Sequence, residues 1–324
     1  MREVPCANCG AAPVHHYPTA SYAPFLLDRV FGIQPESLGE RLGAADLART
    51  QRATLWLFRC ILGCFPLGRR FLGYRGRART ILAACPECGF LGPAAELAET
   101  DIGNLYRDYR SPGYNADRIR YEPEYAALAP VIGRHGQEVR ERLSHVDGFL
   151  GPILDCEGIR TVLDWGGGDG SFIPVRLRNR AVTVLDLCED ARPPSPYRFT
   201  ATLAPGEGFD YIQLCHVLEH LRYPRKELEG ILCHLNPGGY LYLEVPYERT
   251  PEDLEGLRRG DPRVHHLIHE HLNLYDETSL AALGRSLGLR LEACARVKLE
   301  CGYASVQTVS AVFQVAGRLG TRAE

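Results

Sequence analysis

The second half of the chain alternates short apolar runs with segments of helical periodicity. The apolar runs predict buried strands at 161–164, 181–187, 209–214 and 240–245. Helices are predicted over 171–177 and before the Leu235-Asn236-Pro237-Gly238-Gly239 break. Another, at about 276–287, precedes two last strands at 290–298 and 306–315. This alternation is typical of a doubly wound parallel α/β sheet.

The stretch before this alternation has a different pattern. Residues 101–151 have mainly helical periodicity, with a tyrosine-rich loop at 106–115 that is expected either to cover a site or to pack against the preceding module. Further upstream, Cys60 and Cys64 lie four apart in the apolar stretch 55–65, so they are predicted to share a helical face in a core. The polar tail after Gly317 is expected to fray.

A glycine-rich turn follows the first of the predicted strands. Asp164 is followed by Gly166, Gly168 and Gly170 at alternate positions, which lets the backbone approach a ligand closely. The G-x-G-x-x-G pattern of dinucleotide-binding turns fails in either frame, because its last place would fall on Ser171 or Ile173. Asp186, at the end of the next strand, is placed to accept the ribose hydroxyls of a nucleoside. A plain strand-to-helix loop remains the alternative.

Two C-x-x-C knuckles, each followed by glycine, stand in the N-terminal third of the chain. Cys6 and Cys9 form one, and Cys85 and Cys88 form the other. Four thiolates complete the tetrahedral shell of a structural zinc ion, although four unconnected buried thiols remain the alternative. The expected organisation is a zinc-binding module with a helical insertion at 1–100, a helical lid or linker at 101–150, a Rossmann-like domain at 151–317 and a flexible tail at 318–324.

Composition narrows the class of protein only moderately. Hydrophobic residues make up 45%, charged residues 24%, and the net charge is −3, as in an ordinary soluble protein. The N-terminus lacks a signal-peptide pattern and no apolar run is long enough to span a bilayer, so a cytoplasmic location is expected, with twelve reduced or metal-bound cysteines. The segment 49–79 is rich in arginine and free of acidic residues. It predicts either a solvated surface or a binding site for an anionic substrate, while nucleic acid is not expected.

Three separated segments together carry a family resemblance: the glycine turn with Asp164 and Asp186, the strand at 209–214 with its His216-Val217-Leu218-Glu219-His220 continuation, and the Asn236-Pro237-Gly238-Gly239 break. This combination resembles class I S-adenosylmethionine-dependent methyltransferases. With the cysteine knuckles and the Glu270-His271 pair, it resembles bacterial methyltransferases of sugar and natural-product pathways. These include C-methyltransferases of nucleotide-linked keto-sugars, but no further C-terminal domain is recognisable here.

The resemblance implies a set of roles for individual residues. Asp164 and the glycines would hold the amino-acid part of S-adenosylmethionine, and Asp186 its ribose. His271, after Glu270, matches the general base of the sugar C-methyltransferases, and a histidine with a near-neutral pKa suits that proton transfer. His216 and His220 are expected at the carboxyl edge of the sheet, beside cofactor and acceptor, where one would polarise the acceptor oxygen.

Other interpretations remain open at the level of sequence. The H-x-x-E-H pattern of residues 216–220 also matches inverted zinc peptidases. A metal cluster could form from four later histidines, His265, His266, His269 and His271. The expected function is methyl transfer to a small molecule, such as a phosphorylated or nucleotide-linked sugar. An RNA methyltransferase and a non-catalytic binding protein on the same scaffold are the alternatives.

Overall fold

The computed structural model describes most of the chain, and all statements below concern the residues it describes. These are 5–11, 14–22, 24–32, 79–93, 97–123, 125–133, 136–186, 195–248, 255–256, 259, 265–267 and 270–315. The arginine-rich segment up to residue 78, Cys60, Cys64, His269 and the tail at 316–324 lie outside them, as do the side chains of His265 and His266.

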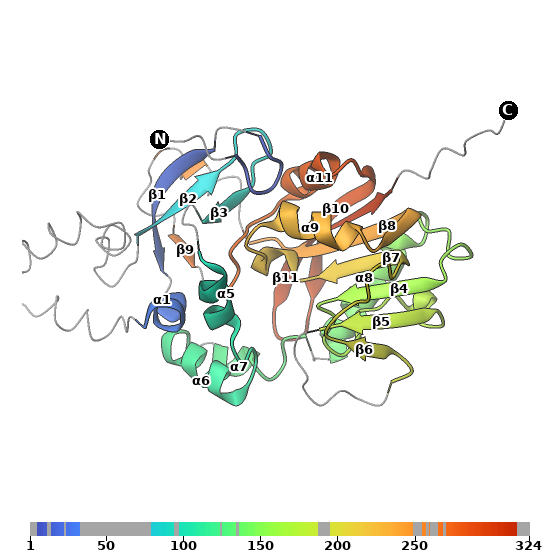
Figure 1. Ribbon diagram of the computed structural model, residues 1–324. Coiled ribbons are helices and arrows are strands. Elements are labelled where there is room, and N and C mark those ends of the chain that lie inside the picture. The colour runs from blue at the N-terminus through green and yellow to red at the C-terminus, as the bar shows by residue number, and fades with distance from the viewer. Residues whose placement is uncertain are drawn as a thin grey trace, which may run out of the picture.

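A seven-stranded mixed sheet dominates the second half of the chain (Figure 1), in the order β10-β11-β8-β7-β4-β5-β6. Its strands are β4 (Thr161–Trp165), β5 (Ala181–Leu185), β6 (Arg198–Thr200), β7 (Phe209–Cys215), β8 (Leu235–Pro246), β10 (Arg290–Glu300) and β11 (Ser305–Gln314). Strands β4 to β8 are parallel, while β11 runs antiparallel to both β8 and β10. The predicted strands at these places are confirmed, and the sheet is Rossmann-like.

The order of the sheet creates a switch point beside β4. After β4 the chain continues outward through β5 and β6, and then returns to the other side of β4 as β7. In open α/β sheets, ligands bind at the carboxyl ends of the strands where the order reverses in this way. The crevice beyond β4 and β7 is therefore the expected ligand site.

Helices cover both faces of this sheet, because successive strand residues point to opposite sides. On one face, Leu163, Ile212 and Leu243 pack with residues of α9 (Pro224–Leu232) and α11 (Glu277–Ser286). On the other, Val162 and Tyr211 pack against α8 (Gly136–Leu150). Asp276 caps α11 by accepting a hydrogen bond from the Ser279 backbone, which confirms the helix predicted there.

A smaller sheet, in the order β3-β2-β1-β9, lies beside the large one. Its strands are β1 (His15–Tyr22), β2 (Arg79–Ala84), β3 (Leu91–Pro93) and β9 (His265–Leu267). The last of these comes from the insertion after β8 and pairs in parallel with β1. Four helices stand next to it: α1 (Pro24–Phe31), α5 (Glu99–Tyr106), α6 (Pro112–Tyr121) and α7 (Tyr125–Leu128). Helices α5 to α8 confirm the helical periodicity of 101–151.

The helix predicted at 171–177 is wrong. Only a short 3-10 turn, η1 (Val175–Leu177), forms there. Pro174 has no backbone N–H and disfavours helical backbone in the residue before it, so residues 171–174 turn instead. The Asn236-Pro237-Gly238-Gly239 break also differs from expectation, because β8 already begins at Leu235 and absorbs the break as a register shift against β7.

Candidate active site

The glycine turn lies at the switch point, between the ends of β4 and β5. Gly166 has φ +70°, and a Cβ there would stand 2.6 Å from a methyl of Val217, on the segment that follows β7. Gly167 was missed by the alternating pattern, but a Cβ there would collide with the Asp164 carboxylate at 2.3 Å. The turn therefore needs glycine because it is pressed between two neighbouring segments.

Two aspartates flank this turn. The backbone N–H of Gly168 donates to the Asp186 carboxylate at 2.8 Å, so Asp186 stands beside the turn, just beyond β5. The Asp164 side chain is buried, and neither of its oxygens has a hydrogen-bond partner among the described residues. Burial raises the pKa of Asp164 to about 7. An unpartnered buried carboxylate fits a cationic ligand group such as the ammonium of S-adenosylmethionine.

His216 follows β7, between the crevice at the switch point and two buried carboxylates. Its backbone has φ +56°, which is uncommon for a residue with a side chain. Its ring nitrogens lie 3.5 Å from Glu219 and 3.4 Å from Glu244. Arg142 donates to Glu244 at 3.0 Å, and the positive charge of this guanidinium, outweighing burial, holds the pKa of Glu244 well below its usual range. His216 thus lies against an ionised carboxylate beside the crevice.

A second group of polar side chains assembles around His220. Its Nδ1 lies 3.1 Å from the Tyr106 hydroxyl and 3.1 Å from the backbone oxygen of Glu270, and Tyr106 also donates to that oxygen. The His220 and His271 rings stand edge to face, with centroids 4.8 Å apart. Because Nδ1 faces an acceptor oxygen, the proton of neutral His220 belongs on Nδ1, and Nε2 keeps a free lone pair.

The two histidines differ in protonation at neutral pH. Burial lowers the pKa of His220 below its usual range, so this ring is neutral. Burial also opposes charge on His271, but the Glu248 carboxylate, 2.8 Å from its Nδ1, outweighs burial and raises the pKa of His271 to about 9. A neutral acceptor beside a protonated donor is typical of acid–base chemistry.

Glu270, expected beside the base, is occupied by other contacts. Its carboxylate accepts hydrogen bonds from Arg118 and Tyr114, both at 2.6 Å, and Arg118 also binds Glu122. Burial works against ionisation, but Arg118 outweighs it and lowers the pKa of Glu270 to about 2. The side chain therefore anchors α6, and its backbone oxygen orients His220.

Glu219 lies between His216 and the polar side chains around His220. It is fully buried, its carboxylate has no hydrogen-bond partner among the described residues, and Oε1 lies 3.9 Å from Nε2 of His220. Its backbone oxygen accepts from Leu272 and Asn273, which ties the segment after β7 to the segment that carries His271. This pairing explains how residues 50 positions apart meet at His220 and Glu270.

The helical geometry of a zinc peptidase is absent from this segment. Only Leu218–His220 form a 3-10 turn, and His216 lies outside it, so the two histidines do not share a face of a helix. The alternative metal cluster of His265, His266, His269 and His271 includes three side chains outside the described part, while the described His271 is bound to Glu248.

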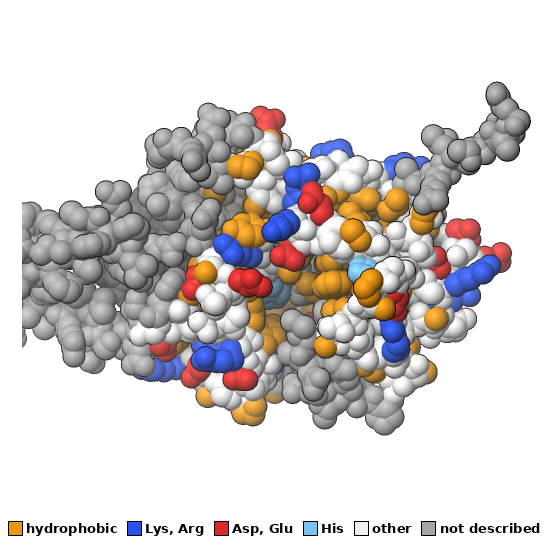
Figure 2. Space-filling view, viewed as in Figure 1, with side chains coloured by type: hydrophobic (Ala, Val, Ile, Leu, Met, Phe, Trp, Pro, Cys, Tyr) orange, Lys and Arg blue, Asp and Glu red, His pale blue; other side chains and the backbone are white. Residues whose placement is uncertain are grey.

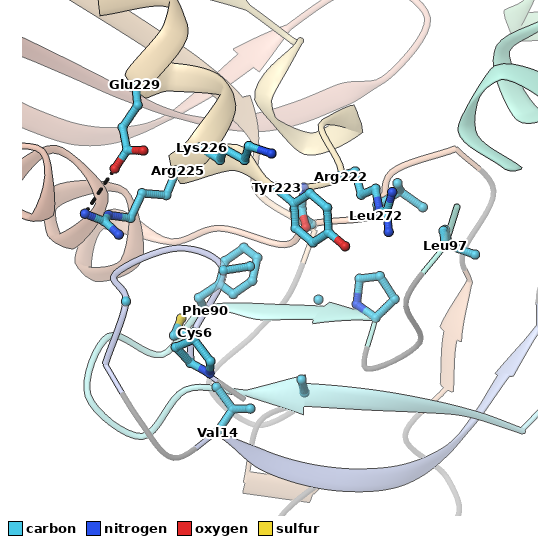
Figure 3. A pocket seen from close by; sticks show the side chains of 17 residues that line it. Cys6, Val14, Phe90, Leu97, Arg222, Tyr223, Arg225, Lys226, Glu229 and Leu272 are labelled. Atoms are coloured by element: carbon cyan, nitrogen blue, oxygen red, sulfur yellow. Dashed lines mark ion pairs between the residues drawn. The ribbon is translucent and has the colours of Figure 1, made fainter. Parts of the chain in front are cut away.

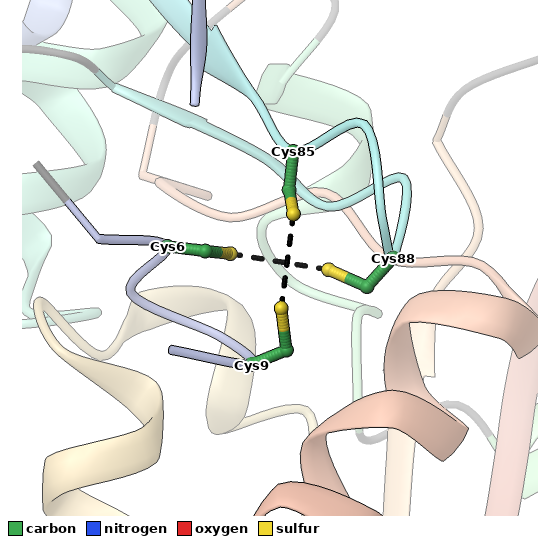
Figure 4. Close-up of side chains that lie close together, drawn as sticks. All are labelled: Cys6, Cys9, Cys85 and Cys88. Atoms are coloured by element: carbon green, nitrogen blue, oxygen red, sulfur yellow. Dashed lines mark hydrogen bonds between the residues drawn. The ribbon is translucent and has the colours of Figure 1, made fainter. Parts of the chain in front are cut away.

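The four knuckle cysteines converge on one point (Figure 4). The Sγ atoms of Cys6 and Cys88 are 3.9 Å apart, and those of Cys9 and Cys85 are 3.7 Å apart. Tetrahedral zinc with Zn–S bonds of about 2.3 Å places its sulfurs roughly 3.8 Å apart, so the donor set fits this metal. Both knuckles have the same turn, in which the N–H of Gly10 or Gly89 donates to the first cysteine carbonyl at 2.9 Å.

Comparison with known proteins places the chain in a family. A family model described as a methyltransferase domain matches residues 122–293, more than half of the 324 residues. The chain therefore belongs to the methyltransferase family. This match confirms the predicted Rossmann-like methyltransferase and its S-adenosylmethionine cofactor. No curated protein matches the chain.

Solved structures of methyltransferases are similar to the chain. One is the 1,6-didemethyltoxoflavin-N1-methyltransferase of Burkholderia thailandensis with bound 1,6-didemethyltoxoflavin and S-adenosylhomocysteine. It is 17% identical, covers 74% of this chain and 96% of its own, and has a TM-score of 0.47. Another is the N-methyltransferase NodS from Bradyrhizobium japonicum WM9, with 21% identity, coverage of 55% and 96%, and a TM-score of 0.38.

Several site residues carry no motif of their own. Tyr106 from α5 contacts His220, Glu248 just after β8 contacts His271, and Arg118 from α6 binds the Glu270 carboxylate. The tyrosine-rich stretch at 106–115 was the one sequence signal for this side of the site.

Among the described helices, none is long and apolar enough to cross a membrane.

Proposed function

We propose that the chain transfers a methyl group from S-adenosylmethionine to a small-molecule acceptor, such as a sugar or a nucleotide-linked sugar, with a histidine as proton acceptor. The observation that carries this proposal is the contact between a neutral His220 and a protonated His271, whose ring centroids lie 4.8 Å apart. Asp164 and the glycine turn would hold the amino-acid part of the cofactor, and Asp186 the ribose. The cofactor supplies an electrophilic methyl on a positively charged sulfur.

The charge states favour His220 over His271 as the base. Nε2 of His220 takes the proton of the acceptor's C–H, O–H or N–H bond, and the electron pair of that bond forms the new bond to the methyl carbon. The sulfur–methyl pair stays on sulfur, which leaves neutral S-adenosylhomocysteine. His271, protonated at neutral pH, donates a hydrogen bond to a developing negative charge on an acceptor oxygen.

The four cysteines are proposed to hold one structural zinc ion. The support is the sulfur spacing and the softness of a four-thiolate donor set. Such an ion would anchor the small sheet against α11, because Asn8, inside the first knuckle, donates to the Ser279 backbone at 2.8 Å.

The proposal is tested by calorimetry and mass spectrometry together. Titration with S-adenosylhomocysteine should show binding, and incubation of S-adenosylmethionine with candidate acceptors should add 14 Da to one of them, where 14 Da is the mass of CH₂. Absence of any cofactor binding by folded protein would favour the non-catalytic alternative. Methylation of RNA but of no small molecule would favour the RNA alternative.

A further inference from the structure

A cavity separates the small sheet from the segment that leads into α9. Its volume is about 530 Å³, in the range of small-molecule sites. One wall is apolar and comes from the small sheet and the first knuckle, including Val14 and Phe90. The opposite wall holds Arg222, Tyr223, Arg225 and Lys226 (Figure 3). The cavity thus has one apolar wall and one cationic wall.

The positive charge of this wall is only partly neutralised. Glu229 is the single acidic residue of the lining, and it pairs with Arg225 at 3.1 Å. The Nε atoms of Arg222 and Arg225 are both buried and have no hydrogen-bond partner among the described residues. Buried donors without partners are costly, so they point to an acceptor that the protein itself does not supply.

The shape of the cavity suits a flat group as well as an anion. Phe90 and Tyr223 face the space from opposite walls in Figure 3. Gly92 leaves space beside the Phe90 ring, because a Cβ at this position would stand 3.0 Å from that ring and 3.2 Å from Asn273. The Arg222 guanidinium covers one face of the Tyr223 ring, 4.4 Å from its centroid, which leaves the Phe90 ring for packing against a planar group, while guanidinium and ammonium groups bind phosphate oxygens.

Two residues that line the cavity lie close in sequence to the histidine pair. Arg222 follows His220 by two residues, which span at most about 7 Å. Leu272, another lining residue, is the next residue after His271. On the face shown in Figure 2, Lys and Arg side chains alternate with Asp and Glu side chains where the small sheet meets the large one.

We infer that this cavity binds the phosphate-bearing part of the methyl acceptor, a phosphate ester joined to a planar ring, with Arg222 and Lys226 on the phosphate oxygens. The inference rests on the proposed function and gives the acceptor its chemical class. The phosphate end would be held on the α9 side, which leaves the other end of the molecule to reach His220 and His271.

Calorimetric titration with uridine diphosphate, inorganic pyrophosphate and uridine tests this site. Uridine diphosphate should bind most tightly, because it alone offers both a ring and a diphosphate, and its affinity should fall with added salt. The double variant R222A/K226A should lose at least about tenfold in affinity, because it removes two charge-assisted contacts to phosphate oxygens. The matched variant R290A/K298A removes the same charges from exposed ion pairs on β10 and should bind as the natural chain does.

Two results would overturn the inference. One is equal uridine diphosphate affinity in R222A/K226A and R290A/K298A. The other is an absence of uridine diphosphate and pyrophosphate binding by protein that binds S-adenosylhomocysteine. Pyrophosphate binding equal to that of uridine diphosphate would remove the planar ring from the assignment. Titration of each variant with S-adenosylhomocysteine separates these outcomes from a failure of the methyltransferase proposal, which would abolish that binding in the natural chain.

Discussion

The proposed cofactor side and the proposed acceptor side of the site are built in different ways. The glycine turn, Asp164 and Asp186 lie within 23 consecutive residues around β4 and β5. The acceptor side draws on α5, α6, the end of β8, the segment after β7 and the loop that carries His271. A local turn can specify a cofactor site by itself, whereas the histidine pair requires remote segments to be held together. Each experiment below separates the two sides.

The largest expected effect follows removal of the proposed zinc. Metal analysis should find one equivalent per chain, which C85S/C88S loses. Structural zinc contributes roughly 10 kcal/mol or more to folding, so turnover should be abolished and the melting temperature should fall. Binding of S-adenosylhomocysteine, measured by calorimetry below that melting temperature, should be retained because the glycine turn belongs to the seven-stranded sheet and the knuckles flank strands of the four-stranded sheet. The variant C233S, at an exposed thiol, is the control. Unchanged turnover in metal-free protein would contradict the proposal.

Loss of the His220 side-chain base should act on turnover alone. H220N should lower kcat by about 10²–10⁴-fold, the usual contribution of general base catalysis, with unchanged affinity for S-adenosylhomocysteine. His234 binds a backbone oxygen at the far end of the sheet, so H234N serves as a matched control. A larger loss in H271N than in H220N would return the role of base to His271.

Asp164 should control the pH dependence of cofactor binding. Its pKa of about 7 means that the carboxyl is neutral below pH 7 and charged above it. Because the charged form attracts the cofactor ammonium, affinity for S-adenosylhomocysteine should rise by about tenfold between pH 6 and pH 8. D164N should bind more weakly and lose this rise. The outcome opposed to our assignment is a rise of equal size in D164N.

The smallest expected effect is a shift of the alkaline limb, here called the upper limb, in the profile of kcat against pH. His271 donates while protonated, so kcat should fall as pH rises through about 9, and the limb at acid pH should reflect His220. E248Q removes the charge that raises the pKa of His271, so the upper limb should move from about 9 toward 6.5. The profile of kcat against pH measures this shift. An unmoved limb would assign it to another group.

The sequence predicted the arrangement of more residues on the proposed cofactor side than on the proposed acceptor side. The sequence predicted that Asp186 would lie beside the glycine turn, since both follow neighbouring parallel strands, while the role of these residues in cofactor binding stays a prediction. The helix at 171–177 was mistaken because the effect of Pro174 on its neighbours was not weighed. Tyr106, Arg118 and Glu248 could not be assigned, since their roles depend on pairings such as Glu219 with Leu272, which no local pattern encodes.

The parallel pairing of β9 with β1 has a consequence for synthesis of the chain. The smaller sheet is completed only when β9 (His265–Leu267) has been made, long after β1 (His15–Tyr22) and its antiparallel partner β2. At roughly 5–20 residues per second, β1 waits about 12–50 s on the ribosome for β9. Early zinc capture by the cysteines at 6–9 and 85–88 would protect this nascent segment from aggregation while it waits.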